Sequence, residues 1–210
     1  MLRVRQLSCA RGPRVLFREL SFEASPGDLV QITGPNGSGK TTLLRTLAGL
    51  ARAESGTLEW TGPAALMHSR AYIGHAAGWK DVLSVSKNLE LAWQLDAEAA
   101  PREAGAIAAA LERVGLSRQR NLSVARLSQG QRKRLHLARL TRSTRKLWLL
   151  DEPASSLDDA GQALLSEVVV AHLAGGGIAV IATHQPMGIA AARSCRVELG
   201  RNESAMSDAR

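Results

Sequence analysis

The stretch from Gly34 to Thr41 has the residue types and spacing of a loop that binds phosphate groups. It reads Gly34-Pro35-Asn36-Gly37-Ser38-Gly39-Lys40-Thr41 and matches the pattern G-x-x-x-x-G-K-[ST] at every position. Glycines let backbone N–H groups surround phosphate oxygens, Lys40 adds a positive charge, and the Thr41 hydroxyl is a ligand for Mg²⁺. Thr42 continues into a helical segment whose positive end points at the same anion. The sequence therefore predicts a site for a nucleoside triphosphate and Mg²⁺.

Two acidic residues follow an apolar run more than a hundred residues later. Asp151 and Glu152 come directly after Leu147-Trp148-Leu149-Leu150, which predicts a buried central strand. Such a strand carries its last side chains to the sheet edge where the phosphate loop lies. We expect Asp151 to bind Mg²⁺ and Glu152 to polarise a water molecule that attacks the terminal phosphate. The alternative is that Asp-Glu-Pro only begins a helix and has no catalytic task.

The residues Ser128-Gln129-Gly130-Gln131 begin another predicted helix. A serine followed three residues later by a glutamine is a capping-box pattern, in which the two side chains satisfy backbone N–H groups reciprocally. The run Arg132-Lys133-Arg134 then puts three cations in the first turns, where the helix dipole disfavours each by about 0.3–1 kcal/mol. This pattern indicates that the helix start faces an anion or an acidic neighbour.

Together these segments resemble the nucleotide-binding domain of ABC-type ATPases. The resemblance rests on the phosphate loop, Leu127–Gln131, Asp151–Glu152, Ser156-Leu157-Asp158 and His184, in the family's order, and covers about residues 2–200. It implies that two copies dimerise head to tail around ATP, so that Ser128–Gln131 of one copy closes the phosphate loop of the other. It also implies that Asp158 lies at the dimer seam, and that His184 contacts the terminal phosphate and orients the attack.

Three residues depart from the family's usual pattern. Gln129 stands where a glycine is usual and lengthens a side chain near the partner's nucleotide. His75 stands where a glutamine usually senses Mg²⁺, and a neutral imidazole can accept a hydrogen bond from a metal-bound water. Arg11 is the best match to an aromatic residue that stacks on adenine, and a guanidinium plane can also stack on a base.

The position of His75 predicts a pH-dependent ATPase, because an imidazole ionises near neutrality. We expect His75→Gln to flatten the pH dependence of ATPase activity between about pH 6 and pH 8. Steady-state phosphate release measured across that range checks the prediction. An unchanged pH profile would remove His75 from the Mg²⁺ site.

A narrower resemblance is to the ATP-binding subunit of the haem exporter of bacterial cytochrome c maturation. It is carried by Ile73–Leu83, Leu29–Gly37, Leu127–Leu140, Leu147–Trp148 and Ala182–Pro186, and that family shares the histidine at position 75. It implies a homodimer with integral membrane subunits on the cytoplasmic face of the bacterial inner membrane. ATP hydrolysis there drives haem delivery or the release of the haem-loaded chaperone. We expect no direct haem site, because the chain has no Cys-Pro pair or C-x-x-C-H, and His68, His136 and His172 have no haem-site context.

Length and composition fit one globular domain. The chain has 210 residues, 45% of them hydrophobic and 22% charged, and a formal net charge of +8. Two cysteines form no metal-type cluster, no signal peptide is visible, and no apolar run approaches the roughly 18–20 residues of a membrane-spanning helix. We therefore expect a cytosolic protein, or one that lies on a membrane from the cytosolic side. The net charge suits an anionic partner, although a solvated arginine-rich surface between Arg113 and Arg145 is an equal alternative.

The elements that must position these residues predict an α/β fold of the P-loop NTPase type. Strand-like runs lie at 2–5, 15–17, 20–23, 28–33, 56–60, 71–74, 146–150 and 178–182, and the N-terminal ones predict an antiparallel part. Helical runs lie at 40–49, 85–95, 101–114, from 128 onward and at 159–173. Alternating strands and helices predict a largely parallel sheet with a helical subdomain inserted at about 84–140. We expect one ABC ATPase domain over 1–200 and a disordered polar tail over 201–210.

Two other functions remain as alternatives at this point. A soluble ABC ATPase that acts on nucleic acid or ribosomes fits the positive charge, but it predicts tandem ATPase domains or a long insertion, which the sequence lacks. We therefore expect no nucleic acid partner. A simple P-loop kinase leaves the Leu127–Gln131 segment and Asp158 without a role.

Overall fold

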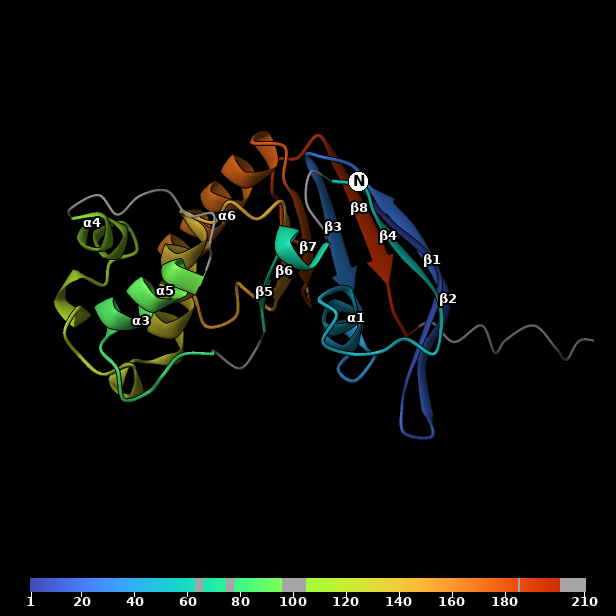
Figure 1. Cartoon of the computed structure of the whole chain (residues 1–210), viewed down its shortest axis with the longest axis horizontal. Helices are drawn as coiled ribbons and strands as arrows, with labels where there is room; N and C mark the ends of the chain where they lie inside the picture. Colours follow the sequence, from blue (N-terminus) through green and yellow to red (C-terminus); the bar gives the residue numbers. More distant parts are fainter. Residues whose placement is uncertain (63–65, 75–77, 96–104, 185, 201–210) are drawn as a thin grey trace, which may run out of the picture.

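Two β-sheets form the frame of the protein, one antiparallel and one parallel (Figure 1). The computed structural model describes residues 1–62, 66–74, 78–95, 105–184 and 186–200. The strands are β1 (Leu2–Arg11), β2 (Arg14–Ala24), β3 (Asp28–Thr33), β4 (Ser55–Trp60), β5 (Arg70–Ile73), β6 (Leu147–Asp151), β7 (Ile178–Ala182) and β8 (Arg193–Glu198). The helices are α1 (Lys40–Leu47), α2 (Leu66–Ser69), α3 (Val85–Leu95), α4 (Ala106–Arg113), α5 (Gln129–Leu140) and α6 (Asp159–Ala174), with 3₁₀ turns at Ser117–Gln119 and Val124–Arg126.

The five-stranded sheet has the order β5-β6-β7-β3-β8, and its described pairings are all parallel. The strands β3, β6 and β7 are buried along their whole length, which explains their nearly continuous apolar runs. Since β3 lies between β7 and β8, the phosphate loop follows an interior strand of the sheet, next to the edge strand β8. The predicted parallel sheet is confirmed.

Successive residues of the central strands point to opposite faces of this sheet and into two separate cores. Trp148 and Leu150 pack with residues of α3, α4, α5 and α6 on one face. Leu147 and Leu149 pack on the other face with leucines of α1 and with residues of β1 and β2. The sheet is therefore covered on both faces, as the period of two along a strand requires.

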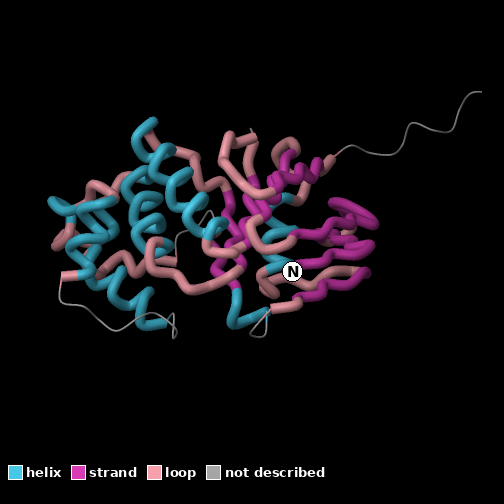
Figure 2. The backbone as a smooth tube through the Cα atoms, turned by 90° about the horizontal axis from the view of Figure 1, so that it is seen from above, coloured by secondary structure: helices cyan, strands magenta, loops and turns pink. Residues whose placement is uncertain are grey.

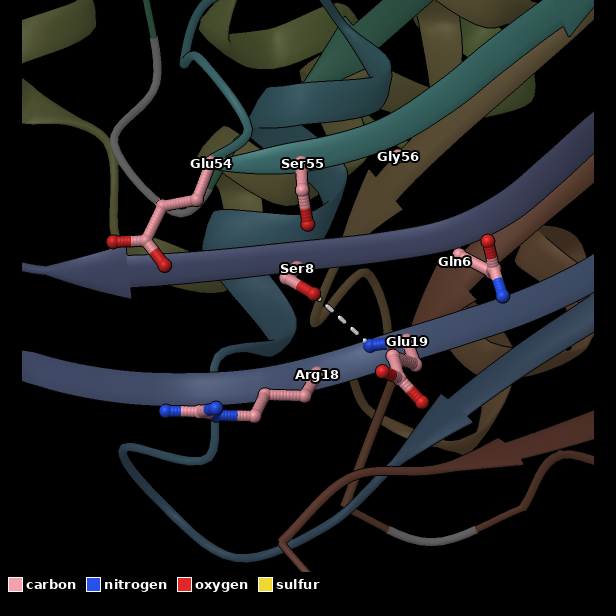
Figure 3. A pocket seen from close by; sticks show the side chains of 7 residues that line it. All are labelled: Gln6, Ser8, Arg18, Glu19, Glu54, Ser55 and Gly56. Carbon is pink, nitrogen blue, oxygen red and sulfur yellow. Dashed lines mark hydrogen bonds between the residues drawn. The ribbon is translucent and has the colours of Figure 1, made fainter.

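The antiparallel sheet has the order β2-β1-β4 and is irregular. The pairing of β1 with β4 shifts between Arg5 and Ser8, and both Gln6 and Glu19 have positive φ, 47° and 50°. These bulges leave a hollow of about 360 Å³ on the sheet, where Ser8 Oγ accepts a hydrogen bond from the Glu19 backbone (Figure 3). The residues that line it are Gln6, Ser8, Arg18, Glu19, Glu54, Ser55 and Gly56.

Helices α3, α4 and α5 lie together at one end of the molecule, opposite the antiparallel sheet (Figure 2). The chain segment between β5 and β6 supplies these helices and both 3₁₀ turns, and its described part contains no named strand. Helix α5 contacts both α3 and α6, so it links this helical end to the helix that covers the parallel sheet. No helix in the described part of the chain is both long and apolar enough to cross a membrane.

The observed elements differ from the sequence prediction at several places. The strand predicted at 2–5 continues to Arg11, and the runs predicted at 15–17 and 20–23 belong to one strand, β2. Helix α4 begins at Ala106 after Gly105 in the left-handed conformation, with φ of 88°, and Pro101 lies outside the described residues. Strand β8 was not predicted, because most of its residues are exposed and it lacks an apolar run. The short helix α2 was also not predicted. The predicted tail at 201–210 lies outside the described residues.

The turn between α6 and β7 packs tightly around His172. The imidazole of His172 stacks on the Trp148 indole, with 3.8 Å between ring centroids and 7° between planes, and its Nε2 lies 3.2 Å from the Ile178 carbonyl oxygen. Burial lowers the pKa of His172 to about 4. A Cβ added at Gly177 would lie 2.2 Å from this ring.

We therefore expect Gly177→Ala to destabilise the fold, because the added methyl group forces the His172 ring off Trp148. A clash of this kind costs about 1–3 kcal/mol, and each kcal/mol lowers the Tm of a domain of this size by about 2–4 °C. Thermal unfolding followed by circular dichroism checks it. Gly188→Ala is the matched control, since a Cβ there meets nothing within 4 Å. Equal Tm values for the two variants would contradict the prediction.

Candidate functional site

The loop after β3 has a fixed shape that depends on a distant part of the chain. Gly34 has φ of 144°, and a Cβ at this position would lie 2.3 Å from the Leu199 carbonyl oxygen. Only glycine fits, so the first glycine of the predicted phosphate loop is required by backbone packing. Helix α1 starts at Lys40, after Gly39 in the left-handed conformation. Lys40 is buried, and its Nζ donates to the carbonyl oxygens of Gly34 and Pro35 at 2.7 and 3.1 Å.

A hydroxyl from α1 meets a carboxylate from β6. Thr41 Oγ1 donates a hydrogen bond to Asp151 Oδ2 at 2.9 Å, although the two residues lie 110 positions apart. Asp151 is the last residue of β6 and is 1% exposed. Since β6 and β3 belong to the same parallel sheet, both residues reach the same edge, as the sequence predicted.

Glu152 follows Asp151 in a strained conformation and faces His184. Its φ is 49°, a region that costs a residue with a side chain about 1–2 kcal/mol. Its backbone N–H donates to the Ala182 carbonyl oxygen at 3.0 Å. Glu152 Oε1 lies 3.3 Å from His184 Nε2, within ion-pair distance, but it is buried and has no hydrogen-bond partner among the described residues. The structure thus leaves a carboxylate oxygen free to accept a proton beside an exposed imidazole.

These side chains share one open cavity of about 450 Å³. Its lining residues are Arg11, Leu16, Asn36, Gly37, Gly39, Lys40, Thr41, Thr42, Asp151, Glu152 and His184. The cavity therefore brings together predicted residues from β1, the phosphate loop, the end of β6 and the loop after β7. Sequence reasoning missed Leu16, an apolar residue of β2 that carries no chemical signal. His75 lies outside the described residues.

The start of α5 lies apart from this cavity and has the predicted cap. Ser128 Oγ accepts from the Gln131 backbone at 3.2 Å, and Gln131 Oε1 accepts from the Ser128 backbone at 3.0 Å. Gln129 Oε1 accepts from Ser156 Oγ at 3.4 Å, and a Cβ at Gly130 would lie 2.5 Å from the Ser156 carbonyl oxygen. The segment Ser128–Gln131 is thus packed against residues that follow β6.

The three cations after this cap each have a partner within the chain. Arg132 pairs with Asp81 at 3.0 Å, and Arg134 pairs with Asp158 at 2.5 Å. Lys133 donates to the carbonyl oxygens of Asp151 and Glu152. Acidic side chains, one of the two kinds of neighbour expected here, thus pair with Arg132 and Arg134, whereas Lys133 bonds to backbone carbonyl oxygens.

Asp158 has a structural task in addition to any role at a dimer seam. It is the N-cap of α6, where its carboxylate accepts from the Gly161 backbone at 3.1 Å. The Arg134 guanidinium, followed by the Gly161 N–H, lowers the pKa of Asp158 below its usual value. The side chain remains 67% exposed.

Comparisons with known proteins agree with this geometry. Residues 17–155 match the family model described as ABC transporter. The cytochrome c biogenesis ATP-binding export protein CcmA of Nitrobacter hamburgensis is 49% identical over 189 residues, covering 88% of this chain and 92% of that protein. The protein of the same name from Yersinia pestis is 42% identical and covers 90% of this chain and 88% of its own length. A solved ATP-binding subunit of an ABC transporter superposes with a TM-score of 0.75 at 23% identity, covering 88% of this chain and 79% of that one.

Proposed function

Because this chain belongs to the ABC transporter family, among the cytochrome c biogenesis ATP-binding export proteins, we propose that ATP hydrolysis in its cavity powers haem export. The chain is the ATP-hydrolysing subunit of such a transporter. The observation that carries the proposal is the cavity itself, which unites Lys40 and Thr41 with Asp151, Glu152 and His184. An anion-binding loop beside a free carboxylate is the arrangement that phosphoryl transfer to water needs.

The reaction that fits these side chains is hydrolysis of the terminal phosphate of ATP. A water oxygen bonds to the γ-phosphorus while the bond from that phosphorus to the β–γ bridging oxygen breaks, giving ADP and inorganic phosphate. Glu152 Oε1 is placed to accept the water proton, since it accepts no hydrogen bond from a described residue and lies beside His184. His184, 53% exposed and beside Glu152, is placed to contact the γ-phosphate and orient the water. Lys40 and the backbone N–H groups of the loop hold the phosphates.

Mg²⁺ fits the oxygen donors at this site. The Thr41 hydroxyl and the buried Asp151 carboxylate lie 2.9 Å apart, and hard cations of this kind prefer such oxygens. When bound, Mg²⁺ neutralises charge on the β- and γ-phosphates. Thr41 and Asp151 would hold Mg²⁺, with His75 as a third residue that contacts it. In this arrangement of ATP, the adenine base stacks on the guanidinium group of Arg11, which lines the same cavity.

We propose that the active form is a head-to-tail homodimer. The capped start of α5 is exposed at Ser128 and Gln129, while the cavity of the same copy contains none of Ser128–Gln131. In the dimer, these residues of one copy close the cavity of the other, and the exposed Asp158 lies at the seam. ATP binding then joins the two copies, and hydrolysis separates them.

The dimer would associate with integral membrane subunits at the cytoplasmic face of the inner membrane. Val82 is 88% exposed and Leu122 is 37% exposed, and their segments are joined by hydrogen bonds such as Val85 N–H to the Leu122 carbonyl at 2.9 Å. We propose this surface as the contact for a cytosolic helix of a membrane subunit. Leu89 of α3, by contrast, is fully buried and belongs to the core.

Co-purification tests the transport function. Affinity purification from detergent-solubilised membranes is expected to recover integral membrane subunits together with ATPase activity that haem-loaded chaperone or haem stimulates. Recovery with nucleic acid, and never with membrane proteins, would reject the transport proposal in favour of a soluble ABC ATPase.

A further inference from the structure

Lys133 is a buried lysine that joins α5 to the backbone of the candidate catalytic residues. Its side chain lies in the described core at 9% exposure, and its Nζ donates to the Glu152 carbonyl oxygen at 2.8 Å and to the Asp151 carbonyl oxygen at 3.4 Å. Burial lowers the pKa of Lys133, whereas the nearby Asp151 and Glu152 carboxylates raise it. A long, flexible ammonium group is rarely placed this way, because its burial requires compensating partners.

The carbonyl that Lys133 contacts belongs to the residue with the strained backbone. The Glu152 carbonyl oxygen also accepts from Ser155 Oγ at 2.8 Å and from the Ser155 backbone at 3.3 Å. Its N–H is fixed by Ala182, and its φ is 49°. Strained conformations persist only where surrounding contacts over-determine them. Removing the lysine amine therefore removes one of the bonds that fix where the Glu152 carboxylate points.

The same helix carries the segment that we place against the partner's nucleotide. Lys133 lies five residues after the Ser128 cap, and the first turns of α5 hold the chain after β6 through three further contacts. These are the Gln129–Ser156 hydrogen bond, the Arg134–Asp158 ion pair and the close packing of Gly130 on Ser156. A shift of α5 is thus transmitted to residues 152–158.

We propose that Lys133 is a positioning residue, which holds the Glu152 carboxylate in its catalytic orientation and couples it to the placement of α5. The inference rests on the proposed ATPase function. A role for Lys133 of this kind connects the two ATP molecules of the dimer through a single copy. The start of α5 contacts the ATP of the partner, whereas Glu152 acts on the ATP bound in the cavity of its own copy. Lys133 does not touch the phosphates in this scheme, so it affects the rate of hydrolysis and not the binding of ATP.

Lys133→Met tests the proposal, because methionine keeps most of the side-chain length and loses the donor. We expect kcat to fall by about 10- to 100-fold, the size of effect that a small misplacement of a catalytic group produces. The KM for ATP and the Kd for a fluorescent ATP analogue are expected to change less than about twofold. Lys133→Arg, which keeps a charged donor, is expected to restore most of kcat. Lys146→Met is the matched control, since Lys146 also donates to a backbone carbonyl, that of Gly175, away from the cavity.

Wild-type kcat in Lys133→Met would overturn the proposal, as would an equal loss in Lys133→Arg and Lys133→Met. A loss of ATP binding that accompanies the fall in kcat would also overturn the proposal, because Lys133 would then contribute to ATP binding. If the methionine variant does not fold, Lys133→Gln replaces it, because glutamine carries no charge and its side chain is one bond shorter than that of lysine, and the same fall in kcat is expected. Glu152→Gln, measured alongside, separates the two hypotheses. If the unaltered protein does not hydrolyse ATP, the ATPase proposal itself fails. If Glu152→Gln hydrolyses ATP normally, Glu152 has no catalytic role for Lys133 to support. If it is inactive while Lys133→Met is normal, only the positioning role fails.

Discussion

Glu152→Gln is expected to stop ATP turnover while ATP still binds. The glutamine side chain has nearly the same shape and keeps an oxygen beside His184, but it cannot accept a proton from the attacking water. Removing a general base lowers a rate by about 10²–10⁴-fold. The hydrogen bonds that Lys40 makes to the phosphate loop are untouched, because neither involves Glu152. Steady-state phosphate release and equilibrium nucleotide binding measure the two effects separately.

The same variant is expected to accumulate as an ATP-bound dimer. If hydrolysis is what separates the two copies, a protein that binds but does not hydrolyse ATP stays joined. Gel filtration with ATP and Mg²⁺ should show a shift to twice the monomer mass, and the shift should vanish with ADP. Normal hydrolysis by Glu152→Gln would remove Glu152 from the catalytic role.

Lys40→Ala is expected to remove ATP binding itself. Lys40 is buried at the start of α1 and reaches back across the loop to Gly34 and Pro35, so its ammonium is fixed beside the predicted phosphate position. A charge-assisted contact with phosphate is worth about 1.5–3 kcal/mol, and 3 kcal/mol corresponds to about a 100-fold weaker Kd. ATPase activity is expected to fall with binding, in contrast to Glu152→Gln. Isothermal titration with ATP and Mg²⁺ measures the change.

Lys87→Ala is the matched control for the loss of one positive charge. Lys87 lies on the exposed side of α3, where it pairs with Glu90 at 2.9 Å and is 58% exposed. We expect its nucleotide affinity to equal that of the unaltered protein. Unchanged affinity in Lys40→Ala, or an equal loss in both variants, would contradict a phosphate-binding role for Lys40.

Much of the fold is readable from the sequence because the central strands are buried on both faces. The runs 28–33 and 178–182 predict β3 and β7 with the observed bounds, since both strands are buried from end to end. The edge strand β8 has no such signal. Its residues Arg193, Ser194 and Arg196 are exposed, and it is recognisable only from its pairing with β3.

Part of the candidate site could be predicted from the sequence and part could not. Residues with a fixed spacing, such as those of the phosphate loop and Asp151–Glu152, are predicted and are brought together in the cavity. Lys133 was visible only as one of three cations at a helix start. The sequence indicated an acidic neighbour but not that the neighbour is a pair of backbone carbonyls, because main-chain geometry leaves no residue-type signal.

The close contact between Gly34 and Leu199 has a consequence for how the protein is made. Among the described strands, β3, which precedes the phosphate loop, pairs with β7 and β8, and these lie about 150 to 165 residues after it in the sequence. During synthesis the loop emerges from the ribosome long before the residues that give it its shape. A growing polypeptide therefore carries the whole phosphate-binding motif without a finished pocket, and nucleotide can be captured only after residues 178–199 have been added.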